Sequence, residues 1–119
     1  MPGFQEISTE KAHDLVKSMK DVVVVDVRTP EEYVGPCGHI DGSILIPVNE
    51  FSQRWRELEA YRTRPIVMIC YSGVRSRMTC GFLAKAGFET LYNAPGMMDW
   101  HDKNFEVVPG QATPDMPEC

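Results

Sequence analysis

Cys70 and Arg75 are the two residues of this sequence whose types and spacing most clearly suggest chemistry, and both lie in the short segment Cys70–Ser76. The reactive form of a cysteine is the thiolate, and a neighbouring arginine or helix N-terminus lowers the pKa of the thiol. Gly73, between them, permits backbone angles that a residue with a Cβ atom resists. The segment therefore predicts a nucleophilic cysteine in a loop whose backbone N–H groups and arginine favour an anion.

The elements expected around this loop place it at the end of a strand. Residues 66–70 form a strongly apolar run after Pro65, and residues 76–86 have helical character and end before Gly87, a suitable C-cap. In open parallel sheets, ligands bind beyond the carboxyl ends of the strands, and a helix N-terminus attracts anions. The simpler alternative is that Cys70 is a small core residue at a strand end, but the composition of the loop favours the nucleophile.

Expected strands and helices alternate along the chain. Strands are expected up to Ile7 and at 22–26, 44–46, 66–70 and 90–92, and helices at 8–19, 29–33, 51–58, 76–86 and 97–103. This alternation predicts an α/β fold in which a mainly parallel, five-stranded sheet has helices on both faces. We expect a single domain over residues 1–105, followed by a proline-containing C-terminal tail over residues 106–119.

Composition and charge exclude several classes of protein. The chain has 119 residues and a net charge of −5, which argues against nucleic acid as the main partner because phosphate backbones require a basic surface. Its apolar runs are shorter than the roughly 18 residues needed to span a membrane. The first residues lack the basic and then apolar pattern of a secretory signal. We therefore expect a cytoplasmic protein without membrane contacts.

Arginines are concentrated between residues 52 and 77. Six arginines and two glutamates lie in this stretch, a local excess of four positive charges in an acidic chain. Two interpretations remain open. The arginines either form a solvated basic face or provide a positive approach for a small anion or an acidic partner protein.

Several motifs, taken in order along the chain, resemble the rhodanese family. The loop Cys70-Tyr71-Ser72-Gly73-Val74-Arg75-Ser76 is similar to the active-site loop of that family. The resemblance continues in the segments 26–33, 38–43, 46–47, 87–88, 91–93 and 95–100. It therefore covers most of the chain, from about Ile7 to Trp100, and implies a rhodanese-like domain.

The resemblance implies a sulfurtransferase that carries sulfur as a persulfide on Cys70. A small anionic donor such as thiosulfate supplies the sulfur, and cyanide, a thiol or a sulfur-carrier protein accepts it, without a metal or organic cofactor. Cys70 and Arg75 are the expected catalytic residues, and Asp26 and Arg28 are expected to support the pocket from the neighbouring strand. The expected substrate-binding residues are Tyr71, Ser72, Gly73, Val74 and Ser76.

Two other functions compete with sulfur transfer. Phosphatases and arsenate reductases of related fold have five residues between the cysteine and the arginine, whereas this chain has four, which makes a tighter ring of N–H donors. A non-catalytic or redox-sensing rhodanese module is the other alternative. The chain also departs from the family pattern in the four residues Val34 to Cys37, where about two are expected, and in Pro95, where glycine is more frequent.

The remaining cysteines and the turn after the valine strand give further expectations. Cys37, Cys80 and Cys119 form neither a CxxC pair nor a metal-ligand spacing, so reduced thiols are expected in the cytoplasm. Cys80 is expected to be packed in the core. Cys37 and Cys119 lie in a loop and in the tail, from which either could reach Cys70, and this motivates a redox hypothesis. Arg28 and Glu32 have the spacing of a helical ion pair.

Overall fold

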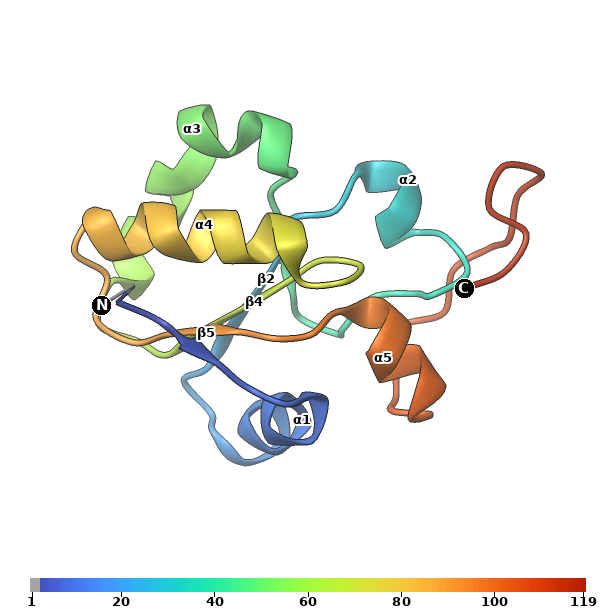
Figure 1. Ribbon diagram of the computed structural model, residues 1–119, viewed down its shortest axis with the longest axis horizontal. Coiled ribbons are helices and arrows are strands. Elements are labelled where there is room, and N and C mark those ends of the chain that lie inside the picture. The colour runs from blue at the N-terminus through green and yellow to red at the C-terminus, as the bar shows by residue number, and fades with distance from the viewer. Residues whose placement is uncertain (1–2) are drawn as a thin grey trace.

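Five parallel strands form the centre of the protein in the order β1-β5-β4-β2-β3 (Figure 1). The computed structural model describes residues 3–119. The strands are β1 (Gln5–Glu6), β2 (Val23–Asp26), β3 (Ile44–Leu45), β4 (Ile66–Ile69) and β5 (Leu91–Asn93). All neighbouring strands pair in parallel, which confirms the predicted α/β architecture. Strand β1 ends at Glu6, one residue earlier than expected, although the Ile7 N–H still donates to the Asn93 carbonyl oxygen at 3.0 Å.

Helices connect the strands and cover the sheet. They are α1 (Thr9–Ser18), α2 (Pro30–Tyr33), η1 (Val48–Glu50), α3 (Phe51–Arg54), η2 (Trp55–Tyr61), α4 (Val74–Lys85) and α5 (Met97–Asp102), where η denotes 3-10 helices. The single helix predicted over 51–58 is instead one α-helical turn between two 3-10 segments. Phe51 and Leu58 are nevertheless buried in the same core cluster, as the sequence predicts. In residues 3–119, no helix is long and apolar enough to cross a membrane.

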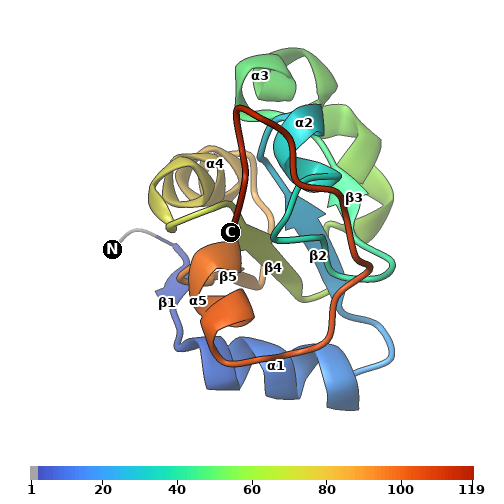
Figure 2. The same ribbon diagram turned by 90° about the vertical axis from the view of Figure 1, so that its right-hand side faces the viewer.

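The valine strand and its neighbour β4 separate two apolar clusters. Val25 and Met68 point into the cluster beneath α3, η2 and α4, whereas Val24 and Val67 point into the cluster formed with α1 and α5. Alternate residues of a strand face opposite sides of a sheet, so both faces of these central strands are buried. The two layers of helices are visible in the end-on view (Figure 2).

Helix α4 begins at Val74, two residues earlier than the sequence indicates. Gly73 is its N-cap residue, with φ +92°, a left-handed conformation that L side chains rarely adopt. The early start makes the loop after Cys70 shorter, so the first turn of α4 lies directly beside the cysteine.

The C-terminal segment after α5 runs along the loop that follows α2. His39 and Val108 form an isolated antiparallel bridge, and the Gln111 N–H donates to the Val34 carbonyl oxygen at 2.8 Å. Figure 2, which looks toward the carboxyl ends of the strands, shows this segment passing α2 and ending in front of the sheet. The C-terminus therefore lies on the side of the molecule that contains the Cys70 loop.

Candidate active site

Cys70 follows β4 directly, and its side chain is buried against the start of α4. The Gly73 N–H donates to Cys70 Sγ at 3.1 Å, and the Ser76 hydroxyl donates to the same sulfur at 3.4 Å. The loop is held from the opposite side, since the Met97 N–H at the start of α5 donates to the Cys70 carbonyl oxygen at 2.8 Å. The end of one strand and the first turns of two helices therefore fix the position of this sulfur.

The surroundings of Cys70 favour the thiolate. Burial alone raises the pKa of this thiol, but the Ser76 hydroxyl and the backbone N–H groups of Ser76, Gly73 and Ser72 stabilise the negative sulfur. Together they outweigh burial, so the pKa of Cys70 lies below its ordinary value. Donors aimed at an anion at the start of a helix produce this effect.

Cys80, which lies in α4, provides an internal comparison. It is fully buried, as predicted, and burial raises the pKa of its thiol well above the ordinary value. Its sulfur contacts a backbone oxygen, that of Tyr92, at 3.6 Å. A carbonyl oxygen does not stabilise a thiolate. Of the two free cysteines, Cys70 is therefore the one suited to nucleophilic attack.

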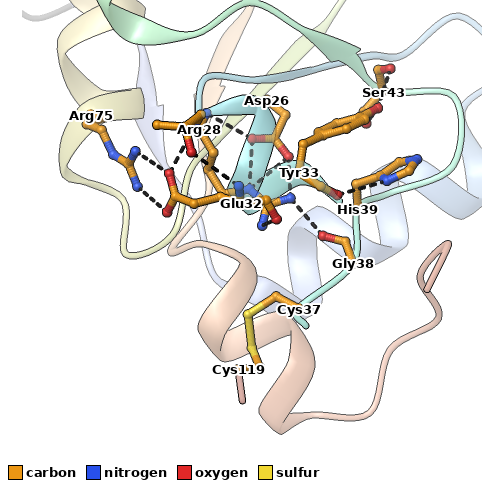
Figure 3. Close-up of polar contacts among 11 residues, drawn as sticks. Asp26, Arg28, Glu32, Tyr33, Cys37, Gly38, His39, Ser43, Arg75 and Cys119 are labelled. Atoms are coloured by element: carbon orange, nitrogen blue, oxygen red, sulfur yellow. Dashed lines mark hydrogen bonds and ion pairs between the residues drawn. A yellow bond between two sulfur atoms is a disulfide. The ribbon is translucent and has the colours of Figure 1, made fainter. Parts of the chain in front are cut away.

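The Arg75 guanidinium forms a forked ion pair with Glu32 (Figure 3). Its two terminal nitrogens lie 2.7 and 2.9 Å from the carboxylate oxygens of Glu32. Hydrogen bonds from Arg75 hold the pKa of Glu32 at about 2, so this carboxyl is ionised throughout the neutral range. Hydrogen bonding to Glu32 raises the pKa of Arg75, and the nearby charge of Cys70 acts in the same direction. Arg75 thus acts on Cys70 as a nearby charge, while its donors are directed at Glu32.

The expected pairing of Arg28 with the Glu32 carboxylate is wrong. Arg28 is buried and binds the Asp26 carboxylate instead, with one contact of 2.8 Å (Figure 3). It also donates to two backbone oxygens, those of Glu32 at 3.1 Å and Gly38 at 2.8 Å. The Glu32 carboxylate accepts a hydrogen bond from the Thr29 N–H at the start of α2. This bond fixes the orientation of the side chain that Arg75 binds. Asp26 and Arg28 therefore brace the loop after β2.

Asn93 is a residue near the site that the sequence reasoning did not single out. It ends β5, is fully buried, and donates from Nδ2 to the Gly73 carbonyl oxygen at 3.1 Å and to Glu6 at 2.9 Å. Its Oδ1 is a buried side-chain oxygen without a hydrogen-bond partner in the described part of the chain. Asn93 thus ties the edge strand to the glycine whose N–H contacts Cys70. Asn93 ends a strand as Cys70 does, and this position was the sequence feature that could have identified it as a residue near the site.

The other expected substrate-binding residues lie in different environments. Ser76 and Gly73 are buried against Cys70, and Tyr71 is half-buried and packs on the cluster beneath α5. Ser72 and Val74 have exposed side chains, and that of Val74 is 58% exposed on α4. Ser72 acts on Cys70 through its backbone N–H.

Cys37 and Cys119 form a disulfide in this structure, so the expectation of reduced thiols is wrong for these two residues. The bond joins the loop after α2 to Cys119, and Figure 3 shows it below the group formed by Arg28 and Glu32. The pairing was not evident from the sequence because 82 positions separate the two cysteines.

Most of the clustered arginines have carboxylate partners. Arg54, Arg62, Arg75 and Arg77 each pair with a glutamate, which neutralises much of the expected local excess of positive charge. Arg75 and Arg77 are the members of this group whose charges act on Cys70, and Arg75 belongs to the loop that follows the cysteine.

Ser76→Ala is expected to make the Cys70 thiol less acidic. The variant removes a hydroxyl donor to a negative sulfur, an interaction of about 1.5 kcal/mol or more, so alkylation of Cys70 by iodoacetamide at pH 7 is expected to slow roughly tenfold. The pH profile of this rate measures the effect, and its midpoint is expected to move to higher pH. Ser18→Ala, a change in an exposed serine of α1, serves as the control. An unchanged profile in Ser76→Ala would mean that the backbone donors alone stabilise the thiolate.

Known proteins match most of this chain. Residues 8–103 match the model of the rhodanese-like domain family. A relative from Bacillus subtilis named putative sulfur carrier protein YrkF is 39% identical over 102 residues, which cover 85% of this chain but only 53% of the relative. The thiosulfate sulfurtransferase GlpE of Pseudoalteromonas translucida is 32% identical over 94 residues, with 79% of this chain and 85% of the relative covered.

A solved structure supports the same conclusion. The crystal structure of a rhodanese-related protein from Thermoplasma volcanium is 32% identical, with a TM-score of 0.75. The similarity covers 88% of this chain and 98% of that one. Motifs, fold and relatives agree, and the chain belongs to the rhodanese family.

Proposed function

We propose that this protein is a sulfurtransferase that carries sulfur as a persulfide on Cys70. In the first half-reaction, the Cys70 thiolate attacks the outer sulfur of a donor such as thiosulfate. A bond forms between Cys70 Sγ and that sulfur, the sulfur–sulfur bond of the donor breaks, and sulfite leaves with the bonding electron pair. The product is the negatively charged persulfide of Cys70.

In the second half-reaction, an acceptor attacks the outer sulfur of the persulfide. The acceptor forms a bond to that sulfur, and the bond between the sulfur and Cys70 breaks. Cyanide becomes thiocyanate, a thiol becomes a new persulfide, and Cys70 regains its thiolate. This is covalent catalysis by a cysteine nucleophile, and it requires a thiolate that also leaves readily. The single observation that carries the proposal is the convergence of the Ser76 hydroxyl and several backbone N–H groups on Cys70 Sγ.

The identity of the acceptor is part of the proposal. The names of relatives, a sulfur carrier and a thiosulfate sulfurtransferase, support a sulfur-carrier protein or a small thiol as acceptor and thiosulfate as donor. Tyr71 follows the cysteine directly and is half-buried, so its ring forms a wall on the α5 side of the loop. An aromatic wall at this place favours a thiol or a protein as the sulfur donor of the first step, as the alternative to thiosulfate.

The direct experiment is a thiosulfate–cyanide assay. The protein is incubated with both compounds, and thiocyanate is measured over time. Turnover that is saturable in both substrates, with the parallel double-reciprocal lines of ping-pong kinetics, is the expected result. If no thiocyanate forms above the uncatalysed rate, thiosulfate is not a donor for this protein.

Phosphatase activity on aryl phosphates is expected to be negligible. Four residues separate Cys70 from Arg75, and the resulting ring of donors encloses one sulfur atom rather than a tetrahedral oxyanion. Hydrolysis of p-nitrophenyl phosphate measures this activity. A glycine inserted between Gly73 and Arg75 is expected to weaken sulfur transfer. Phosphate-ester turnover comparable to sulfur transfer in the unaltered protein would contradict the argument from loop length.

A further inference from the structure

A cavity of about 260 Å³ lies beside the Cys70 loop, and the Cys37–Cys119 disulfide lines it. Tyr71, the residue directly after Cys70, lines the same cavity, as does Glu32, the partner of Arg75. The remaining lining residues are Arg28, Pro36 and 115–118. The cavity therefore joins the surroundings of the candidate nucleophile to the two sulfur atoms of the disulfide.

The two ribbon views agree on the position of the C-terminus. In both, it lies beyond the carboxyl ends of the strands and in line with the loop between β4 and α4 (Figures 1 and 2). Cys119, the last residue, packs on the same apolar cluster as Tyr71 and Cys37. The residue that follows Cys70, Tyr71, therefore shares one cavity with Cys119, although 48 positions of the sequence separate these two residues.

The segment that carries Cys119 is held mainly by the disulfide. Up to Gln111, the chain is fixed by backbone hydrogen bonds to the loop after α2. In residues 112–119, the backbone hydrogen bonds join Thr113 to Met116 and so remain within the segment. When the disulfide is reduced, these backbone hydrogen bonds do not hold residues 112–119 to the rest of the described chain, and eight residues in an extended conformation span far more than the width of the cavity.

Cys37 is held more firmly than Cys119. Its side chain is 5% exposed, and the next N–H, that of Gly38, donates to Gly35 at 2.9 Å, while the Gly38 carbonyl oxygen accepts from Arg28. Cys119 is half-buried at the end of a mostly exposed segment. The pair thus consists of one thiol on a segment with few backbone contacts to the rest of the protein and one thiol on a well-held loop.

We infer that the reduced Cys37–Cys119 pair is a built-in acceptor that removes the sulfur from Cys70 and releases it as sulfide. This inference rests on the proposed persulfide of Cys70 and gives the protein a second activity, reduction of sulfane sulfur. The disulfide present in the structure is the product of this reaction.

Two steps complete the transfer. The Cys119 thiolate first attacks the outer sulfur of the Cys70 persulfide, so that the bond to Cys70 breaks and Cys119 carries the persulfide. Cys37 then attacks Cys119 Sγ, a Cys37–Cys119 bond forms, and hydrosulfide leaves. Two thiols are oxidised to one disulfide while the sulfane sulfur is reduced by two electrons to sulfide. Of the two thiol protons, one remains on the hydrosulfide and the other enters solvent. A dithiol reductant returns the pair to its reduced state.

The test is a single turnover without an external acceptor. The protein is reduced with dithiothreitol, freed of the reductant without oxygen, and mixed with one equivalent of thiosulfate. We expect release of about one sulfide per protein molecule and loss of both the Cys37 and the Cys119 thiols. Protein oxidised at this pair beforehand is expected to retain the sulfur on Cys70 and to release no sulfide.

Two single variants distinguish the roles of the pair. Cys119→Ser is expected to abolish sulfide release and to leave the sulfur on Cys70. Cys37→Ser is also expected to abolish it, with the extra sulfur now on Cys119, because the resolving thiol is missing. Trypsin places Cys37, Cys70, Cys80 and Cys119 on four different peptides, 29–54, 63–75, 78–85 and 104–119, so mass spectrometry can identify the carrier after alkylation. Cys80→Ala is the matched control and is expected to release sulfide normally.

Thiocyanate formation by the same preparations separates this inference from the proposed function. If thiocyanate forms but reduced protein releases no sulfide, the built-in acceptor is refuted and sulfur transfer stands. The same conclusion follows if both serine variants release sulfide at the normal rate. If neither product forms, the proposed function is wrong and the dithiol step falls with it.

Discussion

Cys70→Ser is expected to reduce thiocyanate formation to the uncatalysed rate. A serine hydroxyl is not ionised at neutral pH and cannot form a persulfide, so the reaction loses its covalent intermediate. The substitution replaces one small side chain with another and retains hydrogen bonding to Gly73 and Ser76, so the fold is expected to remain intact. The steady-state assay with thiosulfate and cyanide measures the loss, and a thermal melt verifies folding.

Cys80→Ala is the control for Cys70→Ser. Cys80 is also a free buried thiol, but it lies in the second turn of α4, and its pKa is raised by burial. Its removal is expected to leave turnover within about a factor of two at a temperature well below the melting transition. Loss of activity in Cys80→Ala, with retention in Cys70→Ser, would reverse the roles assigned to the two cysteines.

Arg75→Ala is expected to cause the next largest loss. The guanidinium places a positive charge in the Cys70 loop, and a dianionic donor needs such a charge to approach a thiolate. We expect kcat/KM for thiosulfate to fall by roughly 30- to 150-fold, which corresponds to about 2–3 kcal/mol for a charge-assisted contact. Arg75→Lys is expected to recover only part of this loss, because an ammonium lacks the planar fork that matches an oxyanion.

Glu32→Gln separates the charge of Arg75 from its structural role. The glutamine keeps the size of the side chain and an oxygen for the Thr29 N–H, but it removes the negative charge that faces Arg75. If Arg75 acts through its charge, kcat/KM for thiosulfate remains equal or rises in Glu32→Gln. Equal losses in Glu32→Gln and Arg75→Ala would show that the ion pair braces the loop and that the charge of Arg75 plays no part in donor binding. The pKa of Glu32, about 2, keeps this comparison valid at any pH used for the assay.

The fold and the position of Cys70 could be predicted from local sequence patterns. Four consecutive valines, Val22 to Val25, and the apolar run before Cys70 indicate strands buried on both faces, and these strands do pair in the centre of the sheet. A parallel sheet places the carboxyl ends of neighbouring strands at one edge, so the location of the site followed from topology. Gly73 signalled the turn because its positive φ suits glycine.

The partners of the charged and sulfur-containing side chains could not be predicted in the same way. Glu32 is four positions from Arg28, so local spacing favoured an ion pair between them. The Arg28 guanidinium instead binds the Asp26 carboxylate at the end of β2. The Glu32 carboxylate instead meets Arg75, 43 positions away. The Cys37–Cys119 disulfide depends on the path of the last residues across the loop after α2. Such contacts arise from tertiary packing, which short-range patterns do not contain.

The most direct test of the central claim is to identify the sulfur that first receives the transferred atom. Protein with the Cys37–Cys119 disulfide intact has Cys70 and Cys80 as its free thiols. It is treated with a limiting amount of thiosulfate, alkylated and digested with trypsin, and the peptides are weighed by mass spectrometry. The account predicts one additional sulfur on peptide 63–75, which contains Cys70, and none on peptide 78–85, which contains Cys80. Additional sulfur on peptide 78–85, or on neither peptide while thiocyanate still forms, would contradict the account.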